Sequence, residues 1–357
     1  MSKVWYNTNM ADQNRHTNYC SDDFAGLTAV VQEAGRMAAR EQLKAGGYLK
    51  SDGSIVTQAD LTVQRMLVSE IEARFPGAGV VGEESRGQDT DSREPDTAKE
   101  LTFVIDPIDG TDGYSQGLPG WCVGVGILDR KYEPIGGIVY APNWNIGNPG
   151  NDDRNPKGVR EGITTGGMLF TDLPGQGLTL NGAPYRPPCC LHSFPEVLNN
   201  TSSELPSAAY SETAFESRAE TFHVPEKKDP EKKDPEKEGL NHKLHKRDQL
   251  MVGSKLHTHF SFATYPGKVR SIGSSILHLL SPLIHPRTGG TLLTPCYIWD
   301  IAPAHSFLIH GGLTIETFSK KPFSYHHMVK GALTPDYIFA GFPETIELMR
   351  RHFQPLK

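Results

Sequence analysis

The stretch Val104-Ile105-Asp106-Pro107-Ile108-Asp109-Gly110-Thr111 joins an apolar run to two carboxylates, a proline and a glycine. Residues 101–105 are apolar and rich in β-branched side chains, which predicts a buried strand, and Pro107 removes a donor from the strand ladder. We therefore expect Asp106 and Asp109 to stand at a strand end. Two carboxylates on one rigid turn repel each other unless a cation neutralises them, and a hard cation such as Mg²⁺ is the usual partner of oxygen ligands.

The two residues after this turn suit a phosphate group. Gly110 lets the backbone approach a ligand closely, Thr111 adds a hydroxyl, and the amides there could form a nest that binds an anion. An ordinary polar turn is the alternative, because Asp, Pro and Gly are common turn residues. Other segments of the chain favour the site.

Two further strand-like runs also end in acidic residues. Val80-Val81-Gly82 leads into Glu83-Glu84-Ser85, and Tyr297-Ile298-Trp299 leads to Asp300. Asp60 precedes a segment with apolar residues at helical spacing, which places it at a helix N-terminus. A role as the N-cap of that helix is the alternative for Asp60.

In this order and spacing, the motifs resemble the magnesium-dependent, lithium-sensitive phosphatases, the superfamily of inositol monophosphatase, inositol polyphosphate 1-phosphatase and the 3′(2′),5′-bisphosphate nucleotidases. The segment of Asp60 and the stretch Arg270-Ser271-Ile272-Gly273-Ser274 are also similar to family elements. The resemblance runs from about Asp22 to the C-terminus, with one large insertion. It implies an α/β class with the layered αβαβα sugar-phosphatase fold. We expect a mostly antiparallel sheet in the first half and alternating strands and helices in the second.

Carried over by position, the resemblance implies a role for each motif. Two or three Mg²⁺ ions would be bound by Glu83, Asp106, the carbonyl of Ile108, Asp109 and Asp300, with Asp106 bridging two ions. The metals would neutralise the ester dianion and lower the pKa of a bound water. The pair Asp60 and Thr111 would orient this attacking water and deprotonate it. The amides of Gly110 and Thr111 would hold phosphate oxygens, and Glu84 would support the ligands from behind.

The expected substrate is a phosphate monoester of a small polyol, sugar or nucleotide, with inositol-monophosphatase-like activity ranked first. Leu293 stands where inositol monophosphatases usually carry a glutamate that binds polyol hydroxyls, which an apolar side chain cannot do. Ser254-Lys255-Leu256-His257 is similar to the Ser-Arg-x-His element of bisphosphate nucleotidases, so Lys255 and His257 could bind a second phosphate. Hydrolysis of adenosine 3′,5′-bisphosphate to AMP is therefore the alternative. A non-catalytic scaffold is a third possibility, disfavoured because every metal carboxylate and the Asp60/Thr111 pair are present.

Composition narrows the class of protein. The net charge of −6 over 357 residues argues against a nucleic-acid polymer as partner. The polar residues 1–20 lack the apolar core of a signal peptide, and no run of about 18 apolar residues could span a membrane, so we expect a cytoplasmic protein. Five cysteines form no disulfide or zinc framework. A homodimer is possible, as among relatives.

We divide the chain into a polar tail (1–20), an α+β half with most metal ligands (21–186), an insertion (187–249) and an α/β half (250–357). Within the insertion, Pro225-Glu226-Lys227-Lys228-Asp229 recurs directly afterwards, and such a charged repeat cannot bury a core. We expect a solvated loop there. Packing or structural roles, not catalytic ones, are expected of Cys122, Cys296, Trp299, His305 and His310.

Overall fold

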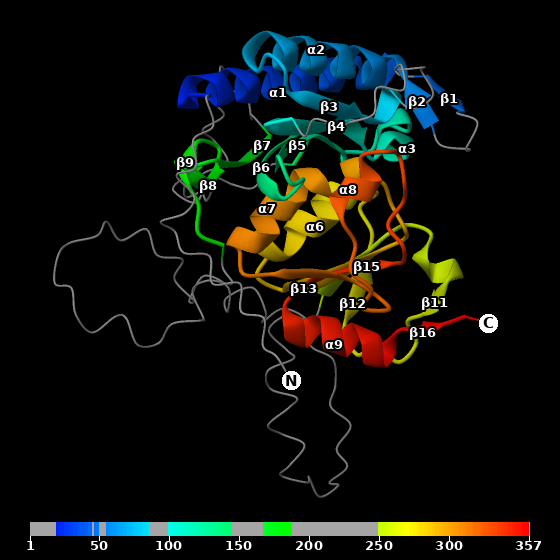
Figure 1. Ribbon diagram of the computed structural model, residues 1–357. Helices are drawn as coiled ribbons and strands as arrows, with labels where there is room; N and C mark the ends of the chain where they lie inside the picture. The colour runs from blue at the N-terminus through cyan, green and yellow to red at the C-terminus, as the bar shows by residue number, and fades with distance from the viewer. Residues whose placement is uncertain are drawn as a thin grey trace, which may run out of the picture.

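The computed structural model describes residues 19–44, 46–49, 55–85, 99–144, 167–187 and 249–356. These residues form five alternating layers of helices and sheets (Figure 1). The helices of the outer, middle and opposite outer layers are α1 (Ser21–Glu41) with α2 (Gln58–Arg74), α6 (Ser275–Ile284) with α7 (Ala302–His310), and α9 (Pro343–His352). The layered αβαβα fold expected from the sequence is confirmed.

The first sheet lies between the outer pair α1 and α2 and the middle helices, and its strand order is β3-β4-β5-β6-β7-β8-β9. Only β3 and β4 pair in parallel within this sheet; the other neighbours are antiparallel. Asn181 and Gly182 join β8 to β9 with positive φ values of 51° and 80°, as a two-residue hairpin turn requires. The strands are β3 (Gly79–Gly82), β4 (Leu101–Asp109), β5 (Cys122–Asp129), β6 (Pro134–Ala141), β7 (Met168–Leu173), β8 (Gly177–Leu180) and β9 (Ala183–Pro184).

The second sheet has the order β12-β10-β13-β15-β14 and lies between the middle helices and α9. Strand β10 pairs in parallel with β12 and β13, whereas β15 pairs antiparallel with β13 and β14. The strands are β10 (Gln249–Val252), β12 (Lys268–Arg270), β13 (Thr288–Leu293), β14 (Thr314–Thr317) and β15 (Ile338–Gly341). The remaining elements are the two-stranded pairs β1 (Gly47–Leu49) with β2 (Ile55–Thr57) and β11 (Phe260–Ser261) with β16 (Gln354–Pro355), and the short helices α3 (Thr111–Ser115) and α8 (Tyr325–Met328).

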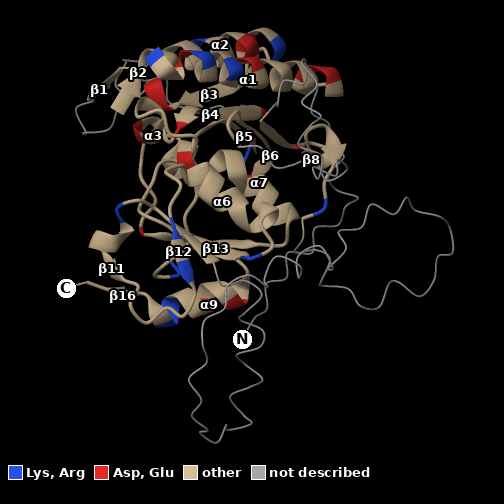
Figure 2. Ribbon diagram, turned by 180° about the vertical axis from the view of Figure 1, so that it is seen from behind, with Lys and Arg blue, Asp and Glu red and all other residues tan. Residues whose placement is uncertain are grey.

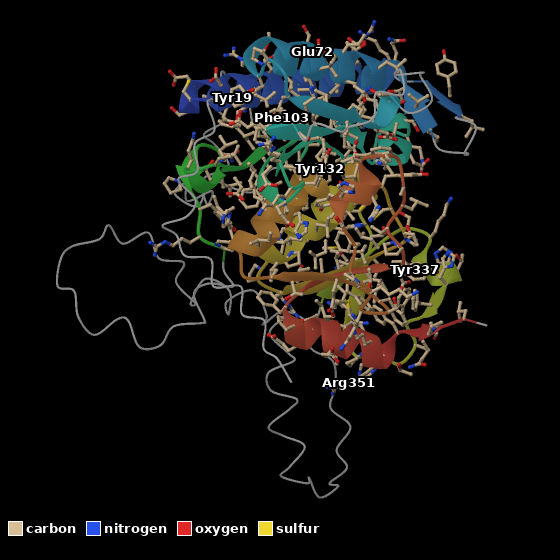
Figure 3. All side chains as sticks on the ribbon, viewed as in Figure 1. Tyr19, Glu72, Phe103, Tyr132, Tyr337 and Arg351 are labelled. Atoms are coloured by element: carbon tan, nitrogen blue, oxygen red, sulfur yellow. The ribbon has the colours of Figure 1, made fainter. Side chains whose placement is uncertain are left out.

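Apolar side chains fill the spaces between the layers. Beneath the outer helices, Phe103 of β4 is fully buried, and its ring centroid lies 4.6 Å from that of Phe75 (Figure 3). Figure 3 also shows Glu72 and Arg351 on opposite outer layers of the molecule. Leu293, at the end of β13, is buried among apolar residues of the middle layer. Its apolar character is therefore explained by packing.

The structure corrects three local expectations. Strand β4 does not end before the carboxylates but continues to Asp109, with a register shift between Asp106 and Asp109 that accommodates Pro107. Residues 297–299 are not a strand, because Ile298–Asp300 forms a single 3₁₀ turn, η6. Helix α2 begins at Gln58, so Asp60 lies in its first turn and Thr57 is the N-cap.

Several predicted features lie outside the described residues. They are most of the polar tail and nearly all of the insertion with its charged repeat. The division into four segments therefore stays a prediction. Among the residues that the structure describes, no helix is both long and apolar enough to cross a membrane.

Candidate metal and phosphate site

Three carboxylates converge where β4 meets the turn η6. Asp106 and Asp109 come from the irregular end of β4 and Asp300 from η6, and one oxygen of each lies within 4.8 Å of the others. Asp106 and Asp109 are buried, and Asp300 is partly buried. The strand and the turn thus bring together residues almost 200 positions apart in the sequence.

Burial and mutual repulsion make this cluster unfavourable when it is fully ionised without a cation. Burial, followed by the charges of Glu83, Asp109, Asp300 and Asp60, holds the pKa of Asp106 well above its usual range. Burial and the charges of Asp109 and Glu83 likewise raise the pKa of Asp300. Asp106 Oδ1 is buried and accepts no hydrogen bond from the described residues. An all-oxygen donor set with an unpaired buried carboxylate oxygen fits a hard divalent cation such as Mg²⁺.

Asp109 is oriented by the N-terminus of α6. Its Oδ2 accepts hydrogen bonds from Ser274 Oγ at 2.5 Å and from the Ile276 amide at 2.6 Å, while Oδ1 accepts one from the Ser275 amide at 3.2 Å. Burial raises the pKa of Asp109 to about 6, although these donors act in the opposite direction. The positive end of the α6 dipole therefore favours the charged carboxylate and fixes its direction.

Asp60 and Thr111 lie within hydrogen-bond distance of each other. Asp60 Oδ2 accepts from the amide and the hydroxyl of Thr57, at 2.8 and 2.5 Å, and Thr111 Oγ1 lies 3.1 Å from Asp60 Oδ1. The Thr111 hydroxyl is also 2.7 Å from the carbonyl oxygen of Ile108, which retains a second lone pair for a cation. Burial raises the pKa of Asp60 to about 6. Asp60 is therefore not the N-cap itself; it occupies the third helical position and closes a capping box with the N-cap Thr57.

Gly110 allows two backbone segments to approach closely beside the carboxylates. Its φ is +98°, and a Cβ there would stand 2.9 Å from the carbonyl oxygen of Gly120. Only glycine accommodates both the left-handed conformation and this contact. Helix α3 begins immediately afterwards at Thr111.

Glu83 and Glu84 lie in the 3₁₀ turn η3 (Glu83–Ser85), directly after β3. The charge of Glu83 contributes to the raised pKa of Asp106 and Asp300, and that of Glu84 to the raised pKa of Asp60. Gln64 of α2, which sequence reasoning missed, accepts a hydrogen bond from the Glu84 amide at 2.8 Å and donates one to Ser85 Oγ at 3.0 Å. Its position one helical turn after Asp60 was the available signal.

Lys255 and His257 are exposed at the start of the turn η5 (Leu256–Thr258). Ser254, next to Lys255, shares a hydrogen bond of 3.2 Å with Ser271, which lies three residues before Ser274. The loop that carries Lys255 and His257, here called the basic loop, is therefore connected to Asp109 through residues 271–274, which hydrogen-bond to Ser254 at one end and to Asp109 at the other. The structure brings Asp106, Asp109 and Asp300 into one cluster and places Lys255 and His257 outside it, at the turn η5.

Other residues weighed in the sequence have structural partners. Trp299 is 5% exposed, with its ring stacked on Tyr297 at 4.8 Å. His305 Nδ1 lies 2.7 Å from Tyr325 Oη, and His310 Nδ1 lies 2.7 Å from Asp172 Oδ2. Cys122 and Cys296 are buried, and burial raises the pKa of both thiols. These contacts agree with packing roles.

Comparison with known proteins adds an independent finding. Residues 22–337 match the model of the inositol monophosphatase family. The chain belongs to the inositol monophosphatase family. Its curated relatives include Protein qutG of Emericella nidulans, 36% identical over 93 residues, which are 26% of this chain and 27% of that protein. Inositol monophosphatase 1 of Bos taurus is 32% identical over 122 residues, 34% of this chain and 42% of that protein. The matched region thus spans about a quarter to a half of the length of these relatives.

Solved structures share the fold of this family member. A suhB protein of Bartonella henselae superposes with a TM-score of 0.56 at 17% identity, covering 93% of this chain and 98% of that one. An IMPase/NADP phosphatase complexed with Mg²⁺ and phosphate gives a TM-score of 0.57 at 14% identity, covering 92% and 95%. At these identities the likeness establishes the fold alone.

Proposed function

We propose that this family member is a Mg²⁺-dependent phosphomonoesterase of small phosphorylated polyols, sugars or nucleotides, with inositol-monophosphatase-like activity ranked first. The observation that carries the proposal is the convergence of three carboxylates beside a hydrogen-bonded Asp60 and Thr111. A phosphate monoester is a dianion, so its hydrolysis needs both positive charge and a proton acceptor. The carboxylates offer ligands for cations that supply the positive charge, and Asp60 with Thr111 offers a proton acceptor.

The cation ligands proposed, for two or three Mg²⁺ ions, are Glu83, Asp106, the carbonyl of Ile108, Asp109 and Asp300. When bound, the cations supply positive charge to the phosphate oxygens and lower the pKa of a water. Gly110 and Thr111 would bind phosphate oxygens through their amides, where the absence of a Cβ at Gly110 leaves the backbone accessible. Glu84 would act through its repulsion of Asp60, since its charge adds to the raised pKa of that residue.

Proton transfer would run through Thr111 to Asp60. The Thr111 hydroxyl can accept the proton of an attacking water while it donates its own hydrogen to Asp60 Oδ1. With a pKa of about 6, Asp60 is mostly ionised near pH 7 and still basic enough to take up a proton. Water would thus be the nucleophile, and no covalent intermediate with a side chain is required.

A specific observation favours 3′(2′),5′-bisphosphate nucleotidase as the second candidate. Lys255 and His257 are exposed on a loop that contacts residue 271, next to Arg270 of β12. Strand β12 carries basic residues at the edge of the second sheet (blue in Figure 2). A second phosphate on the substrate would find a positive partner there.

The deciding experiment measures phosphate release from inositol 1-phosphate, fructose 1,6-bisphosphate and adenosine 3′,5′-bisphosphate, with Mg²⁺ and with EDTA. Mg²⁺-dependent release from inositol 1-phosphate supports the first candidate, and release only from the adenosine compound supports the second. Lys255→Gln separates the two, because it should raise KM for the bisphosphate and leave KM for a monophosphate unchanged. No release from any of the three by folded protein contradicts both.

Three further properties stay predictions. Inhibition by Li⁺ and a homodimeric state are expected from the resemblance, and a cytoplasmic location is expected from the sequence composition. Titration of activity with LiCl, sedimentation of the purified protein and imaging of a tagged chain test them separately.

A further inference from the structure

His278 is a buried histidine of α6 that the proposed reaction does not use. Its side chain is 1% exposed, and its Nε2 lies 2.9 Å from the amide nitrogen of Ile272. Because an amide can only donate, Nε2 must be the acceptor, and the ring proton must sit on Nδ1. Burial lowers the pKa of His278 to about 4, so the ring is neutral near pH 7 and keeps this lone pair.

The bond to Ile272 holds the middle of a short segment with a contact at each end. At one end, Ser271 bonds to Ser254 beside the basic loop. At the other end, Ser274 donates to Asp109 and also caps α6 by accepting from the Leu277 amide. A shift of Ile272 would therefore move both the loop that carries Lys255 and His257 and the hydrogen-bond donors of Asp109, a proposed cation ligand.

Residues 271–274 are tightly packed against the backbone just before β5. A Cβ at Gly120 would stand 2.1 Å from the carbonyl oxygen of Ile272, so the two backbones are in direct contact there. Gly273, the next residue, has a left-handed φ of +93°. The amide of Ile272 is thus fixed by its hydrogen bond to His278, and its carbonyl oxygen is in close contact with the backbone of Gly120.

We propose that His278 is a positioning residue of the phosphatase site, which keeps the Ser274 hydroxyl and the first amides of α6 on Asp109. The inference rests on the proposed function for its catalytic consequence. The hydrogen bonds that orient a cation ligand contribute to cation affinity, and their loss commonly weakens binding about 10- to 100-fold. A histidine that merely fills the core would affect stability alone.

The test compares four variants of the full chain. His278→Phe keeps a ring of similar size and removes the acceptor, whereas His278→Gln returns an amide oxygen at about the reach of Nε2. His278→Met, which is flexible and adapts to irregular cavities, replaces the Phe variant if that variant does not fold. His305→Phe is the matched control, because it removes a second imidazole, partly buried, whose hydrogen bond goes to Tyr325.

Isothermal titration with MgCl₂, steady-state kinetics and thermal melting are the measurements. We expect His278→Phe to raise the Kd for Mg²⁺ about tenfold or more and to lower kcat. His278→Gln should return both values to within about threefold of the wild type. His305→Phe should lower the melting temperature without changing the Kd for Mg²⁺.

Two results would overturn the proposal. One is a Kd for Mg²⁺ and a kcat in His278→Phe equal to the wild-type values, with only the melting temperature lowered. The other is a His278→Gln variant no better than His278→Phe. A wild-type chain that binds Mg²⁺ but releases no phosphate would contradict the proposed function, and the positioning role would then be judged on the Kd alone.

Discussion

The hydroxyl of Thr111 lies 3.1 Å from Asp60 Oδ1 and joins the first turns of α3 and α2, which are 51 positions apart in the sequence. If this pair transfers the proton of the attacking water, loss of either member should lower kcat about 100-fold or more. Thr111→Ala and Asp60→Asn should each reach this loss, and the double variant should lose little more, because the two groups act as one unit.

Thr111→Ser is the control for this pair, since it keeps the hydroxyl, and it should retain most of the activity. Single-turnover kinetics with saturating Mg²⁺ isolates the chemical step. Losses that multiply in the double variant would show that the two residues act independently.

Substitutions in the carboxylate cluster should lower activity but raise the stability of the metal-free protein. Asp109→Asn and Asp300→Asn should abolish turnover, because each removes a proposed cation ligand, while the protein stays folded. In EDTA, Asp300→Asn should melt higher than the wild type, since it relieves the repulsion that raises the pKa of Asp106. Each kcal/mol gained corresponds to about 2 °C in a chain of this size.

Mg²⁺ should reverse that order, since a ligand that binds only the folded state stabilises it. The wild type should gain melting temperature with MgCl₂, and both variants should gain much less. Calorimetry in EDTA and in MgCl₂ makes the comparison. Near-normal turnover in either variant would contradict the site assignment.

The candidate site could be predicted from the sequence where its residues lie close together along the chain. The residues of the turn from Asp106 to Thr111 are consecutive, so their carboxylates, glycine and hydroxyl can be recognised together. The apolar β-branched residues before them predict the buried strand. Asp60 was placed correctly near a helix start, but Thr57 is the cap, and the spacing Thr-x-x-Asp was the overlooked signal.

Contacts between distant segments could not be read in the same way. Ser274 binds Asp109 across 165 positions, and no local pattern states which helix N-terminus faces which carboxylate. Residues 297–299 were expected to be a strand, because a three-residue apolar run has the same pattern in a strand and in a 3₁₀ turn. Tertiary packing decided both.

Gln64 should set the position of Glu83 relative to Asp60. Its amide bonds to the Glu84 amide and to Ser85 Oγ, and a Cβ at Gly82 would stand 2.7 Å from Gln64 Oε1. Gln64→Leu should therefore weaken Mg²⁺ binding about tenfold. Gln58→Leu, at the exposed start of the same helix, is the control and should leave the Kd unchanged. An unaltered Kd in Gln64→Leu would show that the turn η3 holds its position without this clamp.

His310 and Asp172 should make stability depend on pH. Their hydrogen bond, which joins the end of α7 to β7, raises the pKa of His310 above its usual 6.5, while burial acts against it. The folded state thus binds the proton more tightly than the unfolded state. The contribution of the pair is fully present below about pH 6.5 and is lost as the pH rises through the folded-state pKa.

The measurement for this pair is the difference in melting temperature between the wild type and His310→Gln from about pH 5.5 to pH 8.5. The difference should be largest at the acid end and shrink toward the alkaline end. A difference that is constant with pH, or grows with it, would mean that the imidazole is not protonated in the folded protein.

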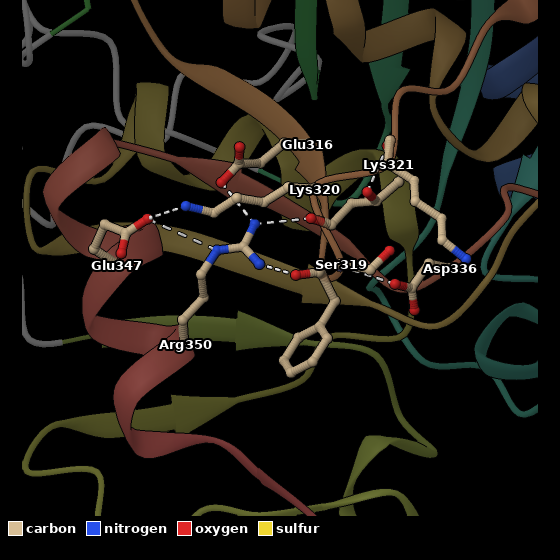
Figure 4. Close-up of polar contacts among 9 residues, drawn as sticks. Glu316, Ser319, Lys320, Lys321, Asp336, Glu347 and Arg350 are labelled. Atoms are coloured by element: carbon tan, nitrogen blue, oxygen red, sulfur yellow. Dashed lines mark hydrogen bonds and ion pairs between the residues drawn. The ribbon is translucent and has the colours of Figure 1, made fainter. Parts of the chain in front are cut away.

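Arg350 should be the main polar contact that attaches α9 to the second sheet (Figure 4). Its Nη2 donates to Glu316 Oε1 at 2.7 Å and to the carbonyl of Thr317 at 2.8 Å, its Nη1 donates to the carbonyl of Phe318, and its side chain is 14% exposed. Arg350→Met keeps much of the volume but leaves these acceptors without their donor, which should cost about 2–3 kcal/mol of unfolding free energy.

Lys320 offers a matched control, because its ion pair with Glu347 at 3.2 Å is exposed on both sides. Lys320→Met should cost less than about 1 kcal/mol. Urea unfolding in saturating MgCl₂ measures both variants. Mg²⁺ affinity should be unchanged in each, because α9 packs on the outer side of the second sheet (Figure 1), whereas the carboxylates belong to β4 of the first sheet and to η6. Equal costs for the two substitutions would mean that burial gives the Arg350 contacts no advantage over a surface ion pair.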